Sequence, residues 1–279
     1  MGNDAIAILH PGEMGGVVGA ALRAAGARVL WASEGRGADT HRRAVAAGLE
    51  NAGTLAQVVR DSALIVSICP PAAAIRVAET VASRGFDGTY VDANAISPAT
   101  ARAVGAVVER AGAVFVDGGI IGPPPRTPGT TRLYLSGPLA QQVAARFAGS
   151  ALEAIALDGP RAAASALKMA YAGWTKGSAA LLMTMRALAI AEGVDDALLR
   201  EWNQSIPGLA GRSESAVRDN ARKAWRFVGE MREIGQSLTA VGLPDAFHDA
   251  AAQVYERLAS YKDAPTPPTM ADAYRALRR

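Results

Sequence analysis

The sequence predicts an α/β fold in which a doubly wound parallel sheet is followed by an all-α C-terminal half. Short apolar runs alternate with helical stretches up to residue 157. A glycine-containing turn follows the first apolar run, and no strand pattern is found after residue 160. Strands that alternate with helices of about 10–15 residues are typical of βαβ units, which build parallel sheets.

The strands of the first half are short apolar segments, and each of the early ones is preceded or followed by a helical segment. They are expected at 5–9, 28–32, 64–68, 89–93 and 114–117, with later strands at the sheet edge at 131–136 and 153–157. The segment 15–25 has helical spacing, because Val18, Leu22 and Ala25 fall on one stripe.

The second half begins with a long apolar helix over residues 162–192. Further helices are expected at 195–203, 213–241 and 244–261, with a break inside the second, and a short helix follows the proline-rich tail at 263–268. The predicted domains are therefore residues 1–160 and 161–279.

Composition excludes several classes of protein. The chain of 279 residues is 50% hydrophobic and 20% charged, which is typical of a globular protein and not of a disordered one. Cys69 is the single cysteine, so an intramolecular disulfide is impossible and a reducing, cytoplasmic compartment is expected. The net charge of +3 is spread along the chain and predicts no nucleic-acid partner.

No membrane partner is expected either. The first six residues lack the basic region and apolar stretch of a signal peptide. The most apolar long segment, 162–191, carries Lys168, Lys176 and Arg186, so it is predicted to be a buried helix. The three histidines are widely separated, and no metal site is predicted.

The turn after the first strand is the first candidate site. Pro11, Gly12, Glu13, Met14 and Gly15 connect a strand to a helix, as in a Rossmann-type dinucleotide-binding unit. Gly12 lets the backbone approach a pyrophosphate, and Gly15 lets the helix pack close to the strand. The free N–H groups of the helix N-terminus then face the phosphate. His10 replaces the first glycine of the usual G-x-G-x-x-G pattern.

The end of the second strand bears on which dinucleotide binds. Ser33 and Arg36 suit a ribose 2′-phosphate, whereas Glu34 suits the free 2′-hydroxyl of NAD. We favour NADP over NAD on these residues. A solvated surface role for Arg36 is the alternative.

Four segments resemble the β-hydroxyacid dehydrogenase and 6-phosphogluconate dehydrogenase superfamily. They are the turn at 11–15, the segment 92–98 after the fifth strand, the glycine-rich segment 117–130 and residues 165–168 on the long helix. The C-terminal half resembles the branch whose helical domain is phosphogluconate-dehydrogenase-like. The resemblance spans most of the chain.

The resemblance implies an NADP-dependent oxidoreductase that moves a hydride between nicotinamide and a small carbonyl or hydroxyl substrate. Lys168 corresponds to the family's general acid or base, and partial burial of a lysine favours proton exchange. Tyr171 could share the proton or orient the substrate. The remaining implied contacts are Cys69, Pro70 and Asn94 for the cofactor, and Gly118, Gly119, Ile120, Ile121, Gly122 and Thr175 for the substrate.

The chain also departs from the family pattern. Tyr171 and Ala172 stand where the family has asparagines, and Ile121 stands where a serine usually holds a carboxylate. A less polar substrate is therefore expected, and imine reduction on the same fold is the first alternative. A sensor that binds NADP without turnover is the second. A homodimer formed by the helical domain is implied by the resemblance.

Overall fold

The computed structural model describes residues 4–278, so the first three residues of the N-terminal segment considered above lie outside it. The chain divides into two units, residues 1–169 and 170–279. The division falls inside a helix and later than the predicted boundary at 160, because the first turns of that helix pack against the sheet.

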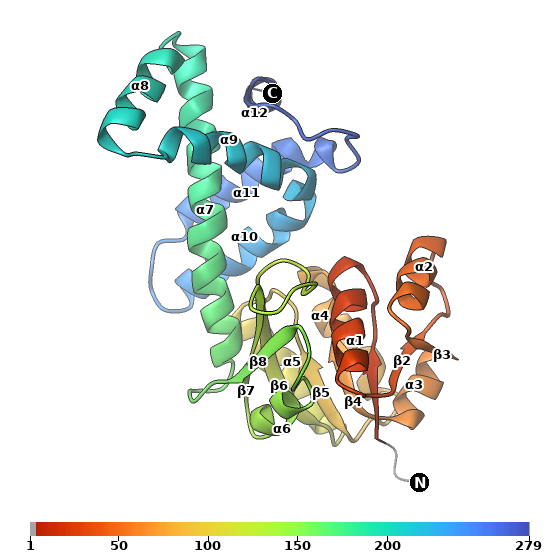
Figure 1. The fold of residues 1–279 in the computed structure, drawn as a ribbon. Helices are drawn as coiled ribbons and strands as arrows, with labels where there is room; N and C mark the ends of the chain where they lie inside the picture. The colour runs from red at the N-terminus through yellow and green to blue at the C-terminus, as the bar shows by residue number, and fades with distance from the viewer. Residues whose placement is uncertain (1–3, 279) are drawn as a thin grey trace. The chain divides into compact units, whose positions relative to one another are not determined.

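The first unit is built on an eight-stranded sheet with the order β3-β2-β1-β4-β5-β6-β7-β8 (Figure 1). The strands are β1 (Ala5–Ile8), β2 (Val29–Ala32), β3 (Glu50–Gly53), β4 (Ser62–Ser67), β5 (Thr89–Asp92), β6 (Val114–Ile121), β7 (Thr131–Ser136) and β8 (Leu152–Ala156). All neighbouring pairs are parallel except β6 and β7, which are antiparallel. The order of β1 to β6 is that of a dinucleotide-binding sheet, and the predicted fold class is confirmed.

Helices cover both faces of this sheet. They are α1 (Glu13–Ala24), α2 (Ala38–Ala46), α3 (Leu55–Asp61), α4 (Ala74–Ala82), α5 (Pro98–Arg110) and α6 (Ala140–Ala145). Alternate residues of β1 serve two separate cores: Ile6 and Ile8 pack with residues of α1, whereas Ala5 and Ala7 pack with residues of α3, α4 and α5. Since successive side chains of a strand point to opposite faces, a continuous apolar run marks a strand buried on both.

Two features of the sheet differ from the prediction. The short strand β3 was not expected, because its sequence Glu-Asn-Ala-Gly is polar and half-exposed. The predicted strand 114–117 extends to Ile121, so the first residues of the expected glycine-rich loop are strand residues paired with β7. Gly122 ends this strand with a φ of 126°, in the left-handed region that favours glycine.

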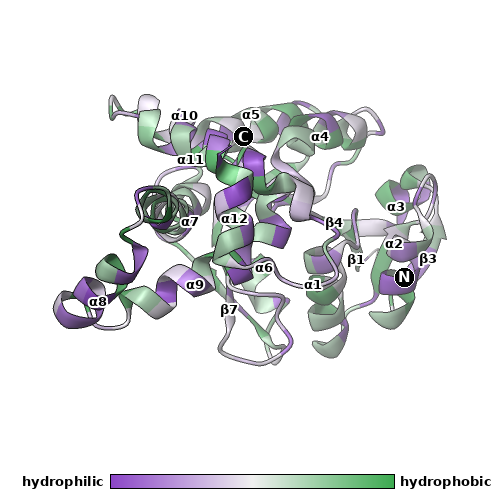
Figure 2. Cartoon of the chain, turned by 90° about the horizontal axis from the view of Figure 1, so that it is seen from above, coloured by the Kyte–Doolittle hydropathy of each residue, from purple (hydrophilic) through white to green (hydrophobic). Residues whose placement is uncertain are grey.

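The second unit is helical, and α7 (Ala163–Ala191) runs through the division between the units. The other helices are α8 (Asp195–Ser205), α9 (Leu209–Asn220), α10 (Ala224–Thr239), α11 (Ala246–Leu258) and α12 (Met270–Leu277). A single 3-10 turn, Ala221–Lys223, separates α9 from α10, so the predicted break in 213–241 is confirmed. In Figure 2, α7 is mostly green and apolar, whereas α8 is mostly purple and polar.

Arg186 is the charged residue that α7 buries in this unit. Its side chain is 3% exposed, and its guanidinium donates to both carboxylate oxygens of Asp195 at 2.6 and 3.0 Å and to Ser213 at 2.7 Å. A buried charge is tolerated only when it is paired and hydrogen-bonded in this way. Of the helices described between residues 4 and 278, none combines the length and apolarity that crossing a bilayer requires.

Candidate cofactor and substrate site

The turn between β1 and α1 leaves open space for an anion. The N–H of Gly12 donates to the carbonyl of His10 at 2.7 Å, and Gly12 is the N-cap residue of α1. A Cβ placed on Gly12 would meet no atom within 4 Å. The first N–H groups of a helix have no partner inside the helix and carry its positive dipole end. The backbone N–H groups of Glu13, Met14 and Gly15 are therefore suited to an anion, and their contact with a cofactor phosphate stays a prediction.

Gly15 is required for the shape of this turn. A Cβ on Gly15 would lie 2.1 Å from the carbonyl oxygen of His10, which no side chain tolerates. Arg43 of α2 braces the other side, because its Nε donates to the carbonyl of Pro11 at 3.3 Å. The two glycines are therefore needed for different reasons. Gly15 allows the close approach of the His10 carbonyl, and Gly12 leaves the space at the N-terminus of α1 free of a side chain.

The loop after β2 carries the residues predicted to choose between NADP and NAD. The N–H groups of Ser33 and Glu34 both donate to the carbonyl of Gly53, at 3.0 and 2.9 Å, which ties this loop to the end of β3. Arg36 follows in a turn closed by its N–H on the Ser33 carbonyl at 3.1 Å. The Glu34 side chain is exposed, whereas Arg36 is half-buried.

The ends of β4 and β5 are joined by a buried polar network. Asn94 is 2% exposed, and its side-chain amide donates to Asp92 at 2.8 Å and to Ser67 at 3.4 Å. Its side-chain oxygen accepts from the N–H of Cys69 at 2.5 Å. Asn94 therefore braces the two loops, and its direct contact with a cofactor stays a prediction. Burial raises the pKa of the Cys69 thiol to about 11, so this thiol is uncharged at neutral pH. Pro70 is exposed beside it.

Lys168 lies against the glycine pair of β6. A Cβ on Gly119 would lie 2.7 Å from the carbonyl oxygen of Ala164 and 3.0 Å from Cβ of Lys168. A Cβ on Gly118 would lie 2.9 Å from the carbonyl oxygen of Asp92. These glycines let β6 approach both the first turns of α7 and the end of β5. The half-buried Lys168 is thereby held at the carboxyl edge of the sheet, where open α/β sheets bind their ligands.

Asp117 anchors the first turn of α7 to β6. Its carboxylate accepts from the backbone N–H of Ser165 at 2.9 Å, from the Ser165 hydroxyl at 2.5 Å and from the Ser136 hydroxyl at 3.0 Å. Ser136 in turn accepts from the N–H of Ala164 at 3.2 Å. Burial raises the pKa of Asp117, and these hydrogen bonds oppose that shift. The network supports the helix turn that carries Lys168. No functional part was predicted for Ser136, because the antiparallel pairing that brings it to Asp117 leaves no local signal in the sequence.

The remaining residues predicted to contact the substrate are either buried in β6 or located on α7. Ile120 and Ile121 are 6% and 4% exposed inside β6. Tyr171, which is 48% exposed, and Thr175 lie on α7 in the second unit. The Thr175 hydroxyl donates to the Tyr171 carbonyl at 3.0 Å. Contact between these residues and a substrate stays a prediction.

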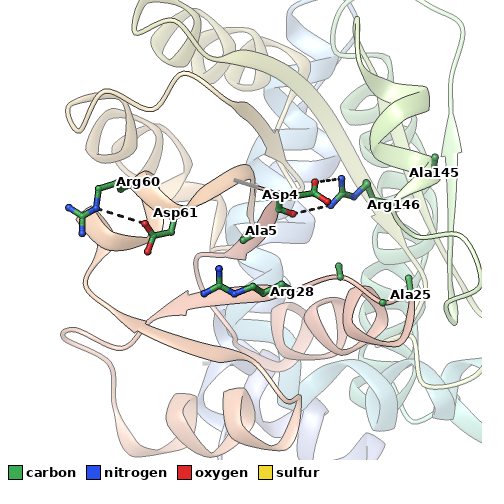
Figure 3. Close-up of a pocket in the computed structure, with 10 residues that line it drawn as sticks. Asp4, Ala5, Ala25, Arg28, Arg60, Asp61, Ala145 and Arg146 are labelled. Atoms are coloured by element: carbon green, nitrogen blue, oxygen red, sulfur yellow. Dashed lines mark hydrogen bonds and ion pairs between the residues drawn. The ribbon is translucent and has the colours of Figure 1, made fainter. Parts of the chain in front are cut away.

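A larger hollow lies at the opposite edge of the sheet, where β1 and β4 begin (Figure 3). Its volume is about 810 Å³, and three arginines line it. Each arginine is already paired with a carboxylate: Arg146 with Asp4, Arg28 with Glu50, and Arg60 with Asp61. The C-terminal end of α1, with its negative dipole, also ends near this hollow. Its charges are neutralised, so it is a poor site for a phosphate.

Comparison with known proteins bears on the fold. Residues 189–258 match the family described as a domain of unknown function, DUF1932. No curated protein sequence matches the chain. Among solved structures, a conserved protein of unknown function, reported to be structurally similar to 3-hydroxyacid dehydrogenases, matches with a TM-score of 0.69 and 25% identity. That match covers 92% of this chain and 98% of the other.

Two characterised enzymes share the fold at lower identity. The 3-hydroxyisobutyrate dehydrogenase of Mycobacterium tuberculosis matches with a TM-score of 0.70 and 17% identity over 99% of both chains. A reductive aminase of Aspergillus terreus, solved with NADPH4, cyclohexanone and allyl amine, matches with a TM-score of 0.58 and 16% identity over 99% of both chains. These matches confirm the predicted resemblance: the chain has the fold of the β-hydroxyacid dehydrogenase superfamily, with a helical C-terminal domain.

Proposed function

We propose that this protein is an NADP-dependent oxidoreductase that transfers a hydride between the nicotinamide and a small carbonyl or hydroxyl substrate. The observation that carries the proposal is the placement of Lys168 against Gly119, on the edge of the sheet that also holds the phosphate turn at Gly12. The fold shared with 3-hydroxyacid dehydrogenases supports the same reading.

The residues present fit a dinucleotide. The open space at Gly12 and the N-terminus of α1 suit the pyrophosphate, and Arg36 beside Ser33 suits a 2′-phosphate. When bound, such a cofactor accepts or supplies the hydride. The protein's own part is to hold the substrate, exclude water and manage the proton.

Lys168 is proposed to manage that proton. As an ammonium it donates to the carbonyl oxygen while the carbonyl carbon is reduced, and as an amine it accepts the hydroxyl proton in the reverse reaction. Asp117 and Ser165 hold the helix turn that carries it. Tyr171 is proposed to orient the substrate from the next turn of α7.

The test follows NADPH by its fluorescence: aldehydes, ketones and cyclic imines are tested for NADPH consumption, and 3-hydroxy acids are tested with NADP⁺ for NADPH formation. We expect turnover of at least one carbonyl compound and a loss of about 10²–10⁴-fold in kcat for Lys168→Ala, the range of a general acid or base. Lys223→Ala, which alters an exposed lysine, is the matched control. Near-wild-type turnover in Lys168→Ala would remove the proton role. Tight NADPH binding without any turnover would favour the sensor.

Imine reduction is the second candidate. Ile121 is apolar and buried where a polar carboxylate contact is usual, and a reductive aminase shares the fold. Turnover of cyclic imines with no turnover of carbonyl compounds would favour this candidate.

We further propose that the protein forms a homodimer through α7. Exposed apolar side chains recur on this helix at successive intervals of three, seven, four and three residues: Tyr171, Trp174, Leu181, Met185 and Leu188. Such spacing places them on one stripe, and an exposed apolar stripe of this kind is typical of an interface between helices.

A further inference from the structure

A small pocket lies beside the carboxyl ends of β1 and β2, apart from the phosphate turn itself. Its volume is about 150 Å³. Leu55, Val77 and Val81 form apolar walls, and His10, Glu34 and Arg36 supply polar groups. These apolar walls suit the faces of a flat heterocycle, and the polar groups beside them suit an anionic substituent on it.

The charge of Arg36 at the rim of this pocket is not neutralised by a carboxylate among the described residues. Within residues 4–278, its guanidinium makes no ion pair and no hydrogen bond, and its Nε is buried without a partner. By contrast, Arg42 on the neighbouring helix pairs with Asp39. A guanidinium that is partly buried and has no protein acceptor is suited to a phosphate ligand.

His10 lies next to Arg36 and brings a side chain where a glycine is usual. Its backbone φ is negative, so the turn accommodates the side chain without left-handed strain. Its Nδ1 is buried without a hydrogen-bond partner. Burial and the charge of Arg36 lower the pKa of His10 to about 4, so the imidazole is neutral at neutral pH. A neutral imidazole offers one donor and one acceptor.

We propose that His10 and Arg36 together recognise the 2′-phosphate on the adenosine ribose, and that His10 is a specificity-determining residue of this chain. Arg36 supplies the charge, and the imidazole supplies a hydrogen bond that a glycine at this position lacks. The inference rests on the proposed use of NADP and adds a recognition residue to it. Glu34 is the opposing group, because its carboxylate favours a free 2′-hydroxyl and repels a phosphate.

The experiment measures binding of adenosine fragments by calorimetry, with no turnover involved. Adenosine 2′,5′-bisphosphate carries the phosphate in question, and adenosine 5′-monophosphate lacks it. We expect the wild type to prefer the bisphosphate by at least tenfold. His10→Gly and Arg36→Met should each lose about tenfold for the bisphosphate, the effect of one lost hydrogen bond to a charged group, and change little for the monophosphate.

Three further variants complete the design. Arg42→Met removes a neighbouring arginine that is already paired with Asp39, and it should bind both fragments like the wild type. His10→Asn keeps a hydrogen-bonding side chain, should recover part of the preference, and replaces His10→Gly if that variant misfolds. In the double variant His10→Gly/Arg36→Met, the losses should not add, because both residues contact one phosphate.

The outcomes separate the two proposals. Unchanged bisphosphate affinity in His10→Gly and His10→Asn would overturn the inference while leaving NADP use intact. Equal affinity of the wild type for both fragments would also overturn it and assign the choice to Glu34. Failure of the wild type to bind NADPH or NADH at all would overturn the proposed function itself.

Discussion

Asp117 at the middle of β6 accepts two hydrogen bonds from Ser165 in the first turn of α7, at 2.9 Å from its N–H and 2.5 Å from its hydroxyl. This pairing joins the strand that carries Gly119 to the helix that carries Lys168. We therefore expect Ser165→Ala to destabilise the fold by about 1.5–3 kcal/mol, as loss of a hydrogen bond to a charged group does. It should also lower kcat and shift its pH profile, because Lys168 loses part of its support. Urea unfolding and pH-dependent kinetics check this.

Ser97→Ala is the matched control for that variant. Ser97 is also buried at a helix N-terminus, where its hydroxyl accepts from the N–H of Thr100 at 3.1 Å, but it supports α5. Its loss should cost about 1 kcal/mol of stability and leave the pH profile of kcat unchanged. If Ser165→Ala, like Ser97→Ala, leaves the pH profile of kcat unchanged, the Asp117 network has only a structural role.

The glycines of the phosphate turn should respond differently to alanine. Gly12→Ala places its methyl in open space but puts a poorer residue at the N-cap of α1, so the free energy of unfolding should fall by no more than about 1 kcal/mol. NADPH binding should weaken at least tenfold, because the methyl occupies the phosphate position. Gly15→Ala clashes with the His10 carbonyl and should lose about 1–3 kcal/mol of stability as well. Denaturation and fluorescence titration measure the two effects. Wild-type NADPH affinity in Gly12→Ala would place the pyrophosphate elsewhere.

Some strands of the sheet could be predicted from the sequence, and one could not. Strand β1 is a continuous apolar run buried on both faces, and β4 contains the buried apolar run 64–66, so both could be predicted from the sequence. The glycines and the prolines around them also mark the loops at the carboxyl edge. The polar strand β3 has no such pattern, because it lies at the edge of the sheet and is only partly buried.

The site was predictable to a smaller extent. Lys168 could be singled out only through the resemblance, since its packing against Gly119 joins residues far apart in the sequence. Asn94 was predicted at the cofactor, but its amide is engaged by Asp92, Ser67 and Cys69. Such networks depend on which strand ends meet in space. The spacing of residues along the chain does not reveal them.

Buried Arg186 should be a major source of stability in the helical unit. Arg186→Ala leaves the partly buried Asp195 without its partner, so we expect a loss of about 3–5 kcal/mol, as for other broken buried pairs. Arg275→Ala breaks the exposed pair with Asp272 and should cost much less stability, because water screens exposed charges. Urea unfolding of the two variants gives the comparison. A loss below about 1 kcal/mol in Arg186→Ala, against the ~3 kcal/mol expected, would contradict this prediction. Water would then replace the guanidinium at little cost.

The apolar stripe of α7 predicts the effect of charge on assembly. Leu181 and Leu188 are 45% and 54% exposed, and glutamates at both positions should convert a dimer into a monomer of 28.7 kDa. Each buried leucine contributes roughly 1.5–3 kcal/mol to an interface, and two buried charges add a desolvation penalty. Light scattering after size-exclusion chromatography measures the mass. Val45→Glu, which alters an apolar residue of α2 that is 75% exposed, is the control. A monomeric wild type would refute the dimer.

His10 makes stability depend on pH in a known direction. Its pKa is about 4 in the fold, below the ordinary 6.5, so the unfolded chain binds its proton first as the pH falls. The stability associated with the neutral imidazole is therefore complete above pH 6.5 and is lost as the pH falls toward 4. Between pH 7 and 4.5 the wild type should lose about 2 kcal/mol relative to His10→Asn.

Chemical denaturation of both proteins at several pH values measures this difference. Arg36→Met should reduce the dependence, because the guanidinium charge is one of the two causes that keep the imidazole neutral, the larger being burial. If the difference between the wild type and His10→Asn were constant over this range, the imidazole would titrate as freely in the fold as in the unfolded chain. His10 would then be solvated, and the pocket beside Arg36 would be wetter than its apolar walls indicate.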